Sequence, residues 1–340
     1  MSEIESNIFN EDDISVVIPS YNSEKTIEGC LRSLYDQTHI PSEIIVVDSS
    51  WDKTKDIIRE KFPHIHLISM NDRTFPGPAR NIGAQNSHGR ILAFIDSDCI
   101  ANRDWISKIL ENHSSGKQIV GGGIETANFN SITGLAGHLL EFREFVPSTE
   151  GRYVIHVPSC NLSYRKDIFM RFGGFPNSYY PQEDLLFNYL ISNNGIKIWF
   201  DPSMIIHHYT REGLRNFLSH QHRLGRVTRC VLKRLELPGS FVGKHPILAW
   251  TTSPLLGLMK FIRSTWFYLT NYKVKIVQFP QLLFILGLGT IWWARGFAAG
   301  THSGLSGIRG WHDPEEPIFS ALLGKQISSL EHISNGDKGK

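Results

Sequence analysis

The stretch Arg90-Ile91-Leu92-Ala93-Phe94-Ile95-Asp96-Ser97-Asp98 decides the fold of this chain. Its apolar run, Ile91–Ile95, ends on two carboxylates, a pattern typical of a strand buried on both faces of a parallel sheet. In such sheets, ligands bind beyond the carboxyl ends of the strands. Asp96 and Asp98 would repel each other there unless a cation or hydrogen bonds compensate, and hard oxygen ligands suit Mg²⁺ or Mn²⁺. The stretch therefore predicts a metal-bound phosphate at this edge of a sheet.

Segments typical of strands and helices alternate on both sides of this stretch. The strands expected elsewhere are Ile14–Ile18, Glu43–Val47, His64–Ser69, Gln118–Glu125, Tyr153–Val157 and Ile198–Phe200. The expected helices are Glu24–Tyr35, Thr54–Lys61, one beginning at Pro78, Asn102–His113, one ending at Gly173 and one from Pro181 to Ile191. This alternation predicts an α/β fold with a doubly wound, mainly parallel sheet and flanking helices.

Two local sequences carry more specific expectations. Ser20-Tyr21-Asn22-Ser23 supplies side chains that can cap the helix after the first strand. Gly121-Gly122-Gly123 lies inside an expected strand, where the missing side chains indicate either a β-bulge or the close approach of a ligand or backbone.

Length and composition exclude several classes of protein. With 340 residues, 41% of them hydrophobic, the chain can bury a full core, which excludes a disordered or fibrous protein. Its four cysteines are scattered without zinc-site spacing, so we expect neither a disulfide framework nor a zinc site. Residues 1–13 carry five acidic residues, no basic residue and no long apolar run, which predicts an acidic tail rather than a secretory signal. We therefore expect the sheet domain to be cytosolic.

Basic residues gather toward the C-terminus although the net charge is only +2. Residues 211–275 hold twelve Lys and Arg against two Glu, an excess of ten positive charges. Such a zone is typical of contact with phosphates or an anionic lipid surface. Because no nucleic-acid-binding motif accompanies it, we expect no nucleic-acid partner.

The same region predicts helices that associate with a membrane. Residues 214–235 place apolar side chains at helical period with basic ones on other faces, as in a basic amphipathic helix. Of the apolar segments Pro246–Met259 and Ile276–Ala294, only the second approaches spanning length. Basic residues between them would put a two-span hairpin's loop on the wrong side, so we expect interfacial or re-entrant helices, or one span. The alternative is that both segments pack as core helices against the sheet.

Five motifs, taken in order, resemble those of the family 2 glycosyltransferases. They are Val16-Val17-Ile18-Pro19-Ser20-Tyr21-Asn22, Val46-Val47-Asp48, Ala79-Arg80-Asn81-Ile82-Gly83, Phe94-Ile95-Asp96-Ser97-Asp98 and Glu183-Asp184. The resemblance covers about residues 14–226 and implies a GT-A fold that binds a nucleotide sugar. Together with the composition of the flanking segments, it divides the chain into an acidic tail, a GT-A domain with donor and acceptor halves, membrane-associating helices and a flexible tail (residues 1–13, 14–210 with halves at about 14–100 and 101–210, 211–300, and 301–340).

The resemblance also implies a donor site. Its nucleotide-sugar-binding residues are Pro19, Tyr21, Glu24, Asp48, Arg80 and Asp96, with Asp48 accepting from the uracil or guanine edge and Arg80 facing the nucleotide or diphosphate. Asp98 is expected to hold a bridging Mn²⁺ or Mg²⁺, with Asp96 and either His207 or His208 as further candidates, or neither histidine. The plainer alternatives are strand-end caps for Tyr21 and Glu24 and a surface ion pair for Arg80.

Asp184 matches the family's general base, which predicts inversion at the anomeric carbon, and Glu183 either supports it or caps the helix. The implied function is a metal-dependent glycosyltransferase that moves a sugar from a UDP- or GDP-linked donor to a lipid-linked or glycan acceptor. We expect it at the cytoplasmic face of the cell membrane, peripheral or with one span or re-entrant helices. The alternatives are a non-catalytic membrane partner that binds glycan or nucleotide, and a sugar nucleotidyltransferase. The latter would normally carry a Gly-rich phosphate loop after the first strand.

Overall fold

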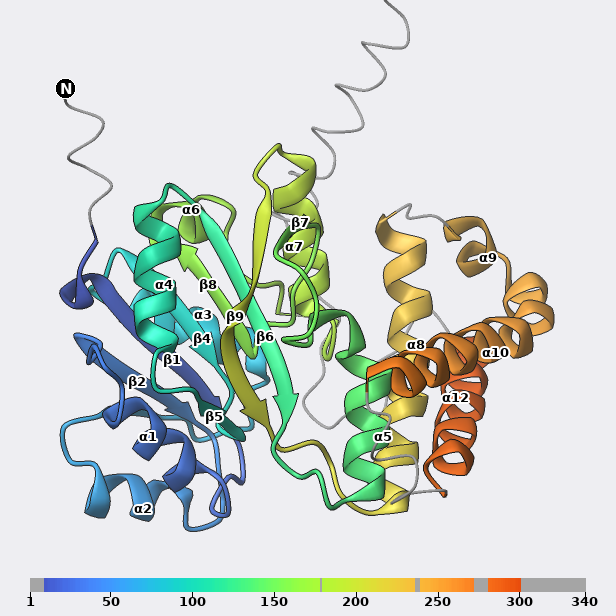
Figure 1. Ribbon diagram of the computed structural model, residues 1–340, viewed down its shortest axis with the longest axis horizontal. Coiled ribbons are helices and arrows are strands. Elements are labelled where there is room, and N and C mark those ends of the chain that lie inside the picture. The colour runs from blue at the N-terminus through green and yellow to red at the C-terminus, as the bar shows by residue number, and fades with distance from the viewer. Residues whose placement is uncertain (1–8, 178, 236–238, 272–280, 301–340) are drawn as a thin grey trace, which may run out of the picture.

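A mixed β-sheet forms the centre of the molecule, with helices on both faces (Figure 1). The structure is a computed structural model that describes residues 9–177, 179–235, 239–271 and 281–300. The strands are β1 (Ile14–Ser20), β2 (Glu43–Asp48), β3 (His66–Ser69), β4 (Ile91–Ile95), β5 (Cys99–Ala101), β6 (Ile119–Thr126), β7 (Arg152–Val154), β8 (Asn161–Arg165) and β9 (Ile198–His208). The helices are α1 (Ile27–Tyr35), α2 (Thr54–Lys61), α3 (Pro76–Gln85), α4 (Trp105–Ser114), α5 (Ile132–Glu141), α6 (Lys166–Arg171), α7 (Glu183–Asn193), α8 (Leu214–Leu235), α9 (Ser240–Lys244), α10 (Pro246–Asn271) and α12 (Leu282–Ala299), with 3₁₀ turns η2 (Glu11–Asp13) and η3 (Arg143–Phe145).

The sheet has a parallel half and a mixed half. Its order is β3-β2-β1-β4-β8-β6-β9-β5, with β7 added beside β9. Strands β1 to β4 pair in parallel, whereas β8 enters antiparallel between β4 and β6. All five residues of β4 are buried, as expected for a strand covered on both faces. The predicted α/β fold, with a doubly wound sheet and flanking helices, is therefore confirmed.

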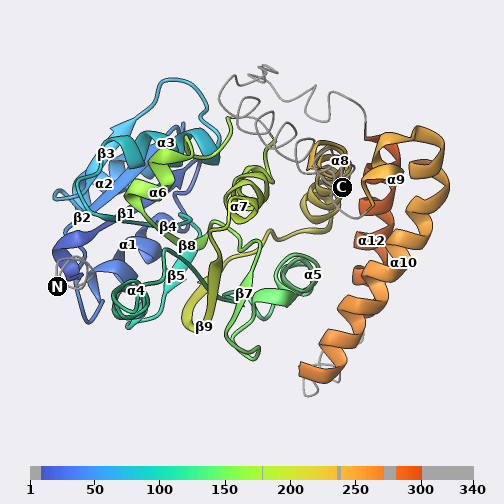
Figure 2. The same cartoon turned by 90° about the horizontal axis from the view of Figure 1, so that it is seen from above.

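Two apolar cores cover the two faces of the sheet (Figure 2). On β1, Val16 and Ile18 face the core beneath α1, α2 and α4, and Val17 faces the core beneath α6 and α7. In the second core, the ring of Phe94 on β4 packs against Phe169 and Phe175 with centroids 5.3 and 5.4 Å apart. These aromatic contacts fix the segment that leads to α7 onto the central strand.

Several elements differ from the sequence-based expectation. Helix α1 begins at Ile27 without a side-chain cap, so the capping role predicted for residues 20–23 is wrong. Ser23 is used differently, because its amide donates to Thr54 Oγ1 at 2.9 Å and its hydroxyl contacts Ser97 Oγ at 2.7 Å. The first bond ties the loop after β1 to the start of α2, and the second ties it to the loop after β4, where the cavity described below opens.

The triple glycine of β6 shows both predicted features, a β-bulge and a close approach. The register with β9 shifts between Gly122 and Gly123, which is a bulge. A Cβ atom at Gly122 would clash with the carbonyl oxygen of Met204 in β9, so the close approach is that of backbone. No prediction had anticipated β8 or α5, and β9 continues past Phe200 to His208.

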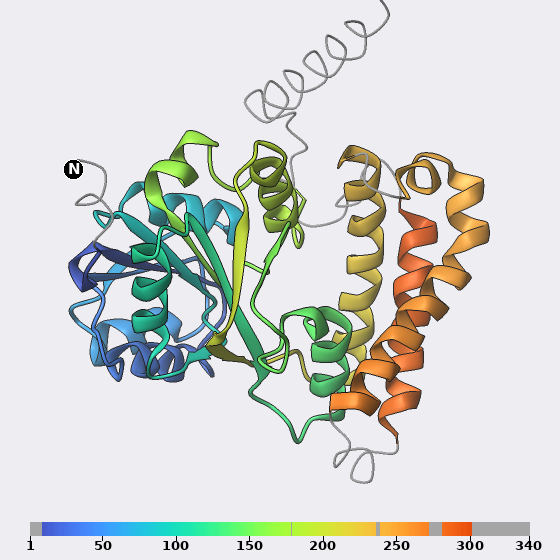
Figure 3. The ribbon, with the colours of Figure 1, turned by 45° about the horizontal axis from the view of Figure 1, so that its top comes forward.

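The C-terminal helices pack together beside the sheet domain (Figure 3). Helix α12 contacts α8, α10 and α5, and a Cβ at either Gly225 or Gly296 would clash with the backbone of the facing helix. The main partners of α10 and α12 are therefore other helices rather than the sheet. Within the described residues, α12 alone is long and apolar enough to cross a membrane by length and composition. Residues 276–280 of the predicted apolar segment, residues 1–8 and the predicted tail 301–340 lie outside the described residues.

Candidate active site

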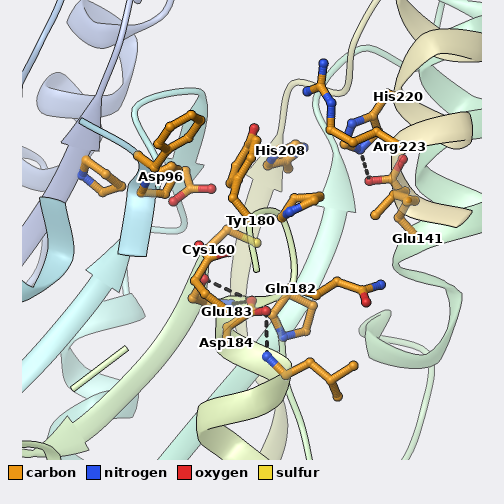
Figure 4. A pocket seen from close by; sticks show the side chains of 18 of the residues that line it. Asp96, Glu141, Cys160, Tyr180, Gln182, Glu183, Asp184, His208, His220 and Arg223 are labelled. Atoms are coloured by element: carbon orange, nitrogen blue, oxygen red, sulfur yellow. Dashed lines mark hydrogen bonds and ion pairs between the residues drawn. The ribbon is translucent and has the colours of Figure 1, made fainter. Parts of the chain in front are cut away.

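A cavity of about 610 Å³ opens beyond the carboxyl ends of β1 and β4, between them and helices α7 and α8 (Figure 4). It brings together eight of the residues singled out in the sequence, which are Pro19, Tyr21, Arg80, Asp96, Asp98, Glu183, Asp184 and His208. Glu24, Asp48 and His207 are not among the residues that line it. The topology explains this grouping, because strand ends meet at one edge of the sheet.

Asp48 and Glu24 have other partners. The Asp48 carboxylate is fully buried and accepts hydrogen bonds from the Ser50 hydroxyl at 2.6 Å and the Ser50 amide at 3.0 Å. Glu24 is exposed, and its carboxylate accepts from the Lys53 amide at 3.4 Å. Both residues therefore bond to the loop between β2 and α2.

Aromatic and basic side chains form the cavity wall near Tyr21. The Arg73 guanidinium lies 4.4 Å from the ring centroid of Tyr21 and 5.0 Å from that of Phe75, and all three residues line the cavity. The Trp51 ring meets Tyr21 edge-on at 5.7 Å. Sequence reasoning missed Arg73 and Phe75, because the loop after β3 carries no motif that marks it.

Arg80 joins the two sides of the cavity. Its side chain is 2% exposed, pairs with Asp96 and lies with Nη1 3.3 Å from Glu183 Oε1. The alternative of a surface ion pair is therefore wrong, and the guanidinium faces two carboxylates. Burial, followed by the charge of Asp184, raises the pKa of Glu183 to about 7, while Arg80 opposes the shift.

Asp98, Cys99 and His208 form a cluster that could hold a metal ion, with ligand atoms within 4.8 Å of one another. Asp98 Oδ1 lies 3.4 Å from His208 Nε2, and pairing of β5 with β9 sets Cys99 opposite His208. The neighbouring His207 points elsewhere, with Nε2 3.0 Å from Asn102 Oδ1. Of the two histidines, His208 is thus the one beside Asp98, whereas Asp96 is turned toward Arg80. Cys99 was missed because a lone cysteine carries no spacing signal.

Three hydrogen bonds orient Asp184 at the start of α7. Its Oδ2 accepts from the Ser159 amide at 2.9 Å and the Ser159 hydroxyl at 3.0 Å, and its Oδ1 accepts from the Leu185 amide at 2.7 Å. Asn188, one turn along α7, accepts from the Tyr164 hydroxyl at 2.5 Å and donates to the Val157 carbonyl at 3.0 Å. Ser159 and the Leu185 amide therefore orient the carboxylate, and Asn188 ties the helix that carries it to Tyr164 of β8.

Comparison with known proteins gives matches over most of this architecture. Residues 15–173 match the family model described as Glycosyl transferase family 2. Glycosyltransferase AglE of Haloferax volcanii is 29% identical over 234 residues, covering 66% of this chain and 76% of its own length. UDP-Glc:alpha-D-GlcNAc-diphosphoundecaprenol beta-1,3-glucosyltransferase WfgD of Escherichia coli is 35% identical over 127 residues. That match covers 36% of this chain, which spans about half (49%) of the length of WfgD.

Among solved structures, the mannosyltransferase PcManGT from Pyrobaculum calidifontis in complex with GDP-Man and Mn²⁺ has a similar fold. The TM-score is 0.53 with 17% sequence identity, and the alignment covers 94% of this chain and 81% of that one. At this identity the likeness concerns the fold.

Proposed function

Because the chain belongs to glycosyl transferase family 2 and is a glycosyltransferase, we propose that it moves one sugar, with inversion, from a UDP- or GDP-linked donor to a lipid-linked or glycan acceptor. The observation that carries the proposal is that a single cavity holds Asp98 beside His208 and, facing them, the hydrogen-bonded Asp184. The family assignment replaces the two alternatives considered above, a non-catalytic binding partner and a sugar nucleotidyltransferase. The names of two relatives support the substrates, since PcManGT holds GDP-Man and Mn²⁺ and WfgD is named for a diphosphoundecaprenol-linked acceptor.

The donor base would bind near Tyr21. Its ring, with Phe75 and the guanidinium of Arg73, offers flat surfaces on which a nucleobase can stack. Asp48 and Glu24 are not among the residues that line this cavity, and the base contact to Asp48 stays a prediction beside the stacking proposed here. Asp96, held by Arg80, would lie on the ribose side.

Asp98 and His208 would hold a divalent cation, Mn²⁺ or Mg²⁺. The fit rests on their distance of 3.4 Å and on the chemistry of the pair, because a carboxylate suits Mn²⁺ or Mg²⁺ and a neutral imidazole is a common metal ligand. When bound, the ion would neutralise negative charge on the leaving nucleoside diphosphate. Arg211 lines the same cavity and adds a guanidinium that favours phosphate oxygens.

Asp184 would act as the general base. A carboxylate oxygen of Asp184 takes the proton of the acceptor hydroxyl. At the same time the acceptor oxygen forms a bond to the anomeric carbon, and the bond from that carbon to the diphosphate oxygen breaks. Attack from the face opposite the leaving group inverts the anomeric carbon. Ser159 and the Leu185 amide orient the carboxylate, which reduces the reorganisation needed at the moment of transfer. Glu183 is buried against Arg80, so its role is to position the first turn of α7.

The outer face of α10 would lie in the membrane interface. Eight apolar side chains along this helix are exposed, which are Ile247, Trp250, Leu255, Leu258, Met259, Ile262, Trp266 and Leu269. We name this set the α10 stripe. Helix α10 has 26 residues and spans about 39 Å at 1.5 Å per residue, and exposed Arg263 and Arg295 flank the stripe. An apolar stripe with tryptophans and flanking basic residues suits the headgroup region of an anionic leaflet.

A donor panel tests the proposal. The purified full chain is incubated with UDP-, GDP- and dTDP-sugars, Mn²⁺ and lipid extract, and sugar transfer is measured. We expect transfer from a UDP- or GDP-sugar that stops when EDTA is added. Binding of nucleotide without turnover on any donor would contradict the proposal, as would retention of the anomeric configuration in the product.

A further inference from the structure

The active-site cavity has a second charged end, formed by helices rather than by the sheet. Arg223 from α8, Lys260 from α10 and Trp293 from α12 line the same cavity as Asp98 and Asp184. Figure 4 shows Glu141, His220 and Arg223 on the opposite side of the pocket from Asp96. Glu141 is the acidic residue of this end, whereas the other four carboxylates that line the cavity belong to the sheet edge and α7. The two ends of the cavity therefore carry opposite charge.

The carboxylate of Glu141 is already engaged. Its Oε2 lies 3.1 Å from His220 Nε2, and its Oε1 accepts from Gln221 Nε2 at 2.8 Å. Burial alone would raise the pKa of Glu141, but His220 and then Arg211 hold it at about 2. Glu141 thus remains ionised and fixes α5 to α8, behind the two cations.

Neither cation at this end has a carboxylate partner at ion-pair distance in the part of the chain that the structure describes. Arg223 makes no hydrogen bond or ion pair with those residues. Lys260 Nζ donates to the Leu140 carbonyl at 2.7 Å, which leaves two further N–H donors, and lies 5.6 Å from the Trp293 ring centroid. Burial and then repulsion from Arg143 lower the pKa of Lys260 to about 8. A partly buried cation without an anion is unfavourable, and a bound anion would relieve this.

We propose that Arg223 and Lys260 form a subsite for the phosphate or diphosphate ester of the acceptor. This inference rests on the proposed function, since the donor phosphates are assigned to Asp98, His208 and Arg211 and the reacting hydroxyl to Asp184. The remaining end of the cavity then receives the far end of the acceptor. A phosphate there would accept N–H bonds from a guanidinium and an ammonium, which are charge-assisted and strong.

The helices that build this subsite also carry the apolar surface. Lys260 and Trp293 have as chain neighbours Phe261 and Ala294, which line an apolar groove of about 670 Å³ between α10 and α12. The α10 stripe continues this surface outward. The proposed ligand is therefore a lipid phosphate, whose hydrocarbon chain leaves the cavity along α10 and α12.

The probe for this subsite is farnesyl monophosphate, compared with farnesol and with inorganic phosphate. The full chain is first saturated with Mn²⁺ and with UDP or GDP, whichever binds, and calorimetry measures the dissociation constant of each probe. We expect farnesyl monophosphate to bind more tightly than both comparison compounds. Arg223→Gln and Lys260→Met should each weaken it about tenfold or more, as for loss of a charged hydrogen bond. Arg215→Gln, an exposed arginine on α8 that does not line the cavity, should leave it unchanged.

Several outcomes would overturn the inference. Equal binding by farnesol would indicate an apolar groove alone, and equal binding by inorganic phosphate would remove the lipid from the account. Weaker binding of farnesyl monophosphate to the nucleotide-saturated chain than to the nucleotide-free chain, or no loss of affinity in Arg223→Gln, would assign the phosphate to the donor site. Lys260→Met removes an internal hydrogen bond, so the melting temperature of this variant is compared with that of the wild type. If Lys260→Met is unfolded, the result for Arg223→Gln decides the test. The inference fails alone if the wild type transfers sugar in the donor panel while these differences in probe binding are absent. The proposed function fails if the wild type binds nucleotide but transfers sugar from no donor.

Discussion

The guanidinium of Arg80 lies 3.3 Å from the carboxylate of Glu183, 103 residues away, and pairs on its other side with Asp96. One buried cation therefore joins the end of β4, where the donor is proposed to bind, to the first turn of α7, where Asp184 lies. Arg80 is therefore a link between the two halves of the cavity, and the stability of the folded protein should depend on the charges of Arg80, Asp96 and Glu183.

Replacing Arg80 should destabilise the fold. Arg80→Met leaves the buried Glu183 and the partly buried Asp96 without their cation, which we expect to lower the free energy of unfolding by about 3–5 kcal/mol. Arg32→Met is the matched control, because its pair with Glu28 lies at the surface and should contribute far less to stability than a buried pair. Urea denaturation measures both variants. A loss in Arg80→Met no larger than in the control would contradict the link.

The raised pKa of Glu183 predicts a pH dependence of stability. In the folded protein its pKa is about 7, above the ordinary value of 4.5, so the folded state binds the proton more tightly. The stabilisation that this group contributes is full below about pH 4.5 and is lost as the pH rises through about 7. Glu183→Gln should remove that part of the decline, measured by urea denaturation at pH 5 and pH 7.5. An identical change in the free energy of unfolding between pH 5 and pH 7.5 in the variant and the wild type would show that the pKa of Glu183 is not raised by folding.

Metal-dependent nucleotide binding should distinguish the two adjacent histidines. Asp98→Asn and His208→Ala remove groups of the candidate metal cluster, so we expect each to weaken Mn²⁺-dependent binding of UDP or GDP about tenfold or more. His207→Ala is the control, since that side chain is directed to Asn102. Calorimetry with Mn²⁺ and with EDTA measures the effect. An equal loss of nucleotide affinity in His207→Ala, or wild-type nucleotide binding that is unchanged by EDTA, would argue against this site.

The α10 stripe should bind vesicles. Trp250 and Trp266 are 70% and 69% exposed on its outer face. The double variant Trp250→Ser and Trp266→Ser should lower binding to anionic vesicles about tenfold or more, because two large apolar groups no longer leave water. Trp51→Ser is the control, since Trp51 is 73% exposed but lies on the sheet domain. Cosedimentation measures binding, and an equal effect of the control would rule out a specific role for α10.

The sequence predicted the parallel half of the sheet well, because Ile91–Ile95 and the strands before it are continuous local apolar runs. It did not predict β8, whose place between β4 and β6 depends on pairing with residues far along the chain. It did not predict α5 either, since Gly134 and Gly137 weaken the helical pattern.

The candidate site residues that the sequence predicted and that line the cavity include residues at strand ends and at the start of α7. Asp98, His208 and Asp184 meet for this reason. Asp48 also ends a strand, but Ser50 folds back onto its carboxylate, and no pattern in the sequence reveals such a loop. Arg80 was predicted to face phosphate, whereas its partners Asp96 and Glu183 become neighbours only through the fold.

The most direct test of the central claim is the transfer rate of Asp184→Asn. The variant keeps the shape of the side chain but cannot take the proton of the acceptor hydroxyl. We predict that kcat for sugar transfer falls about 10²- to 10⁴-fold while the affinity for the nucleotide sugar is unchanged. A kcat within a few-fold of wild type, or a loss confined to donor affinity, would contradict the assignment of Asp184 as the base.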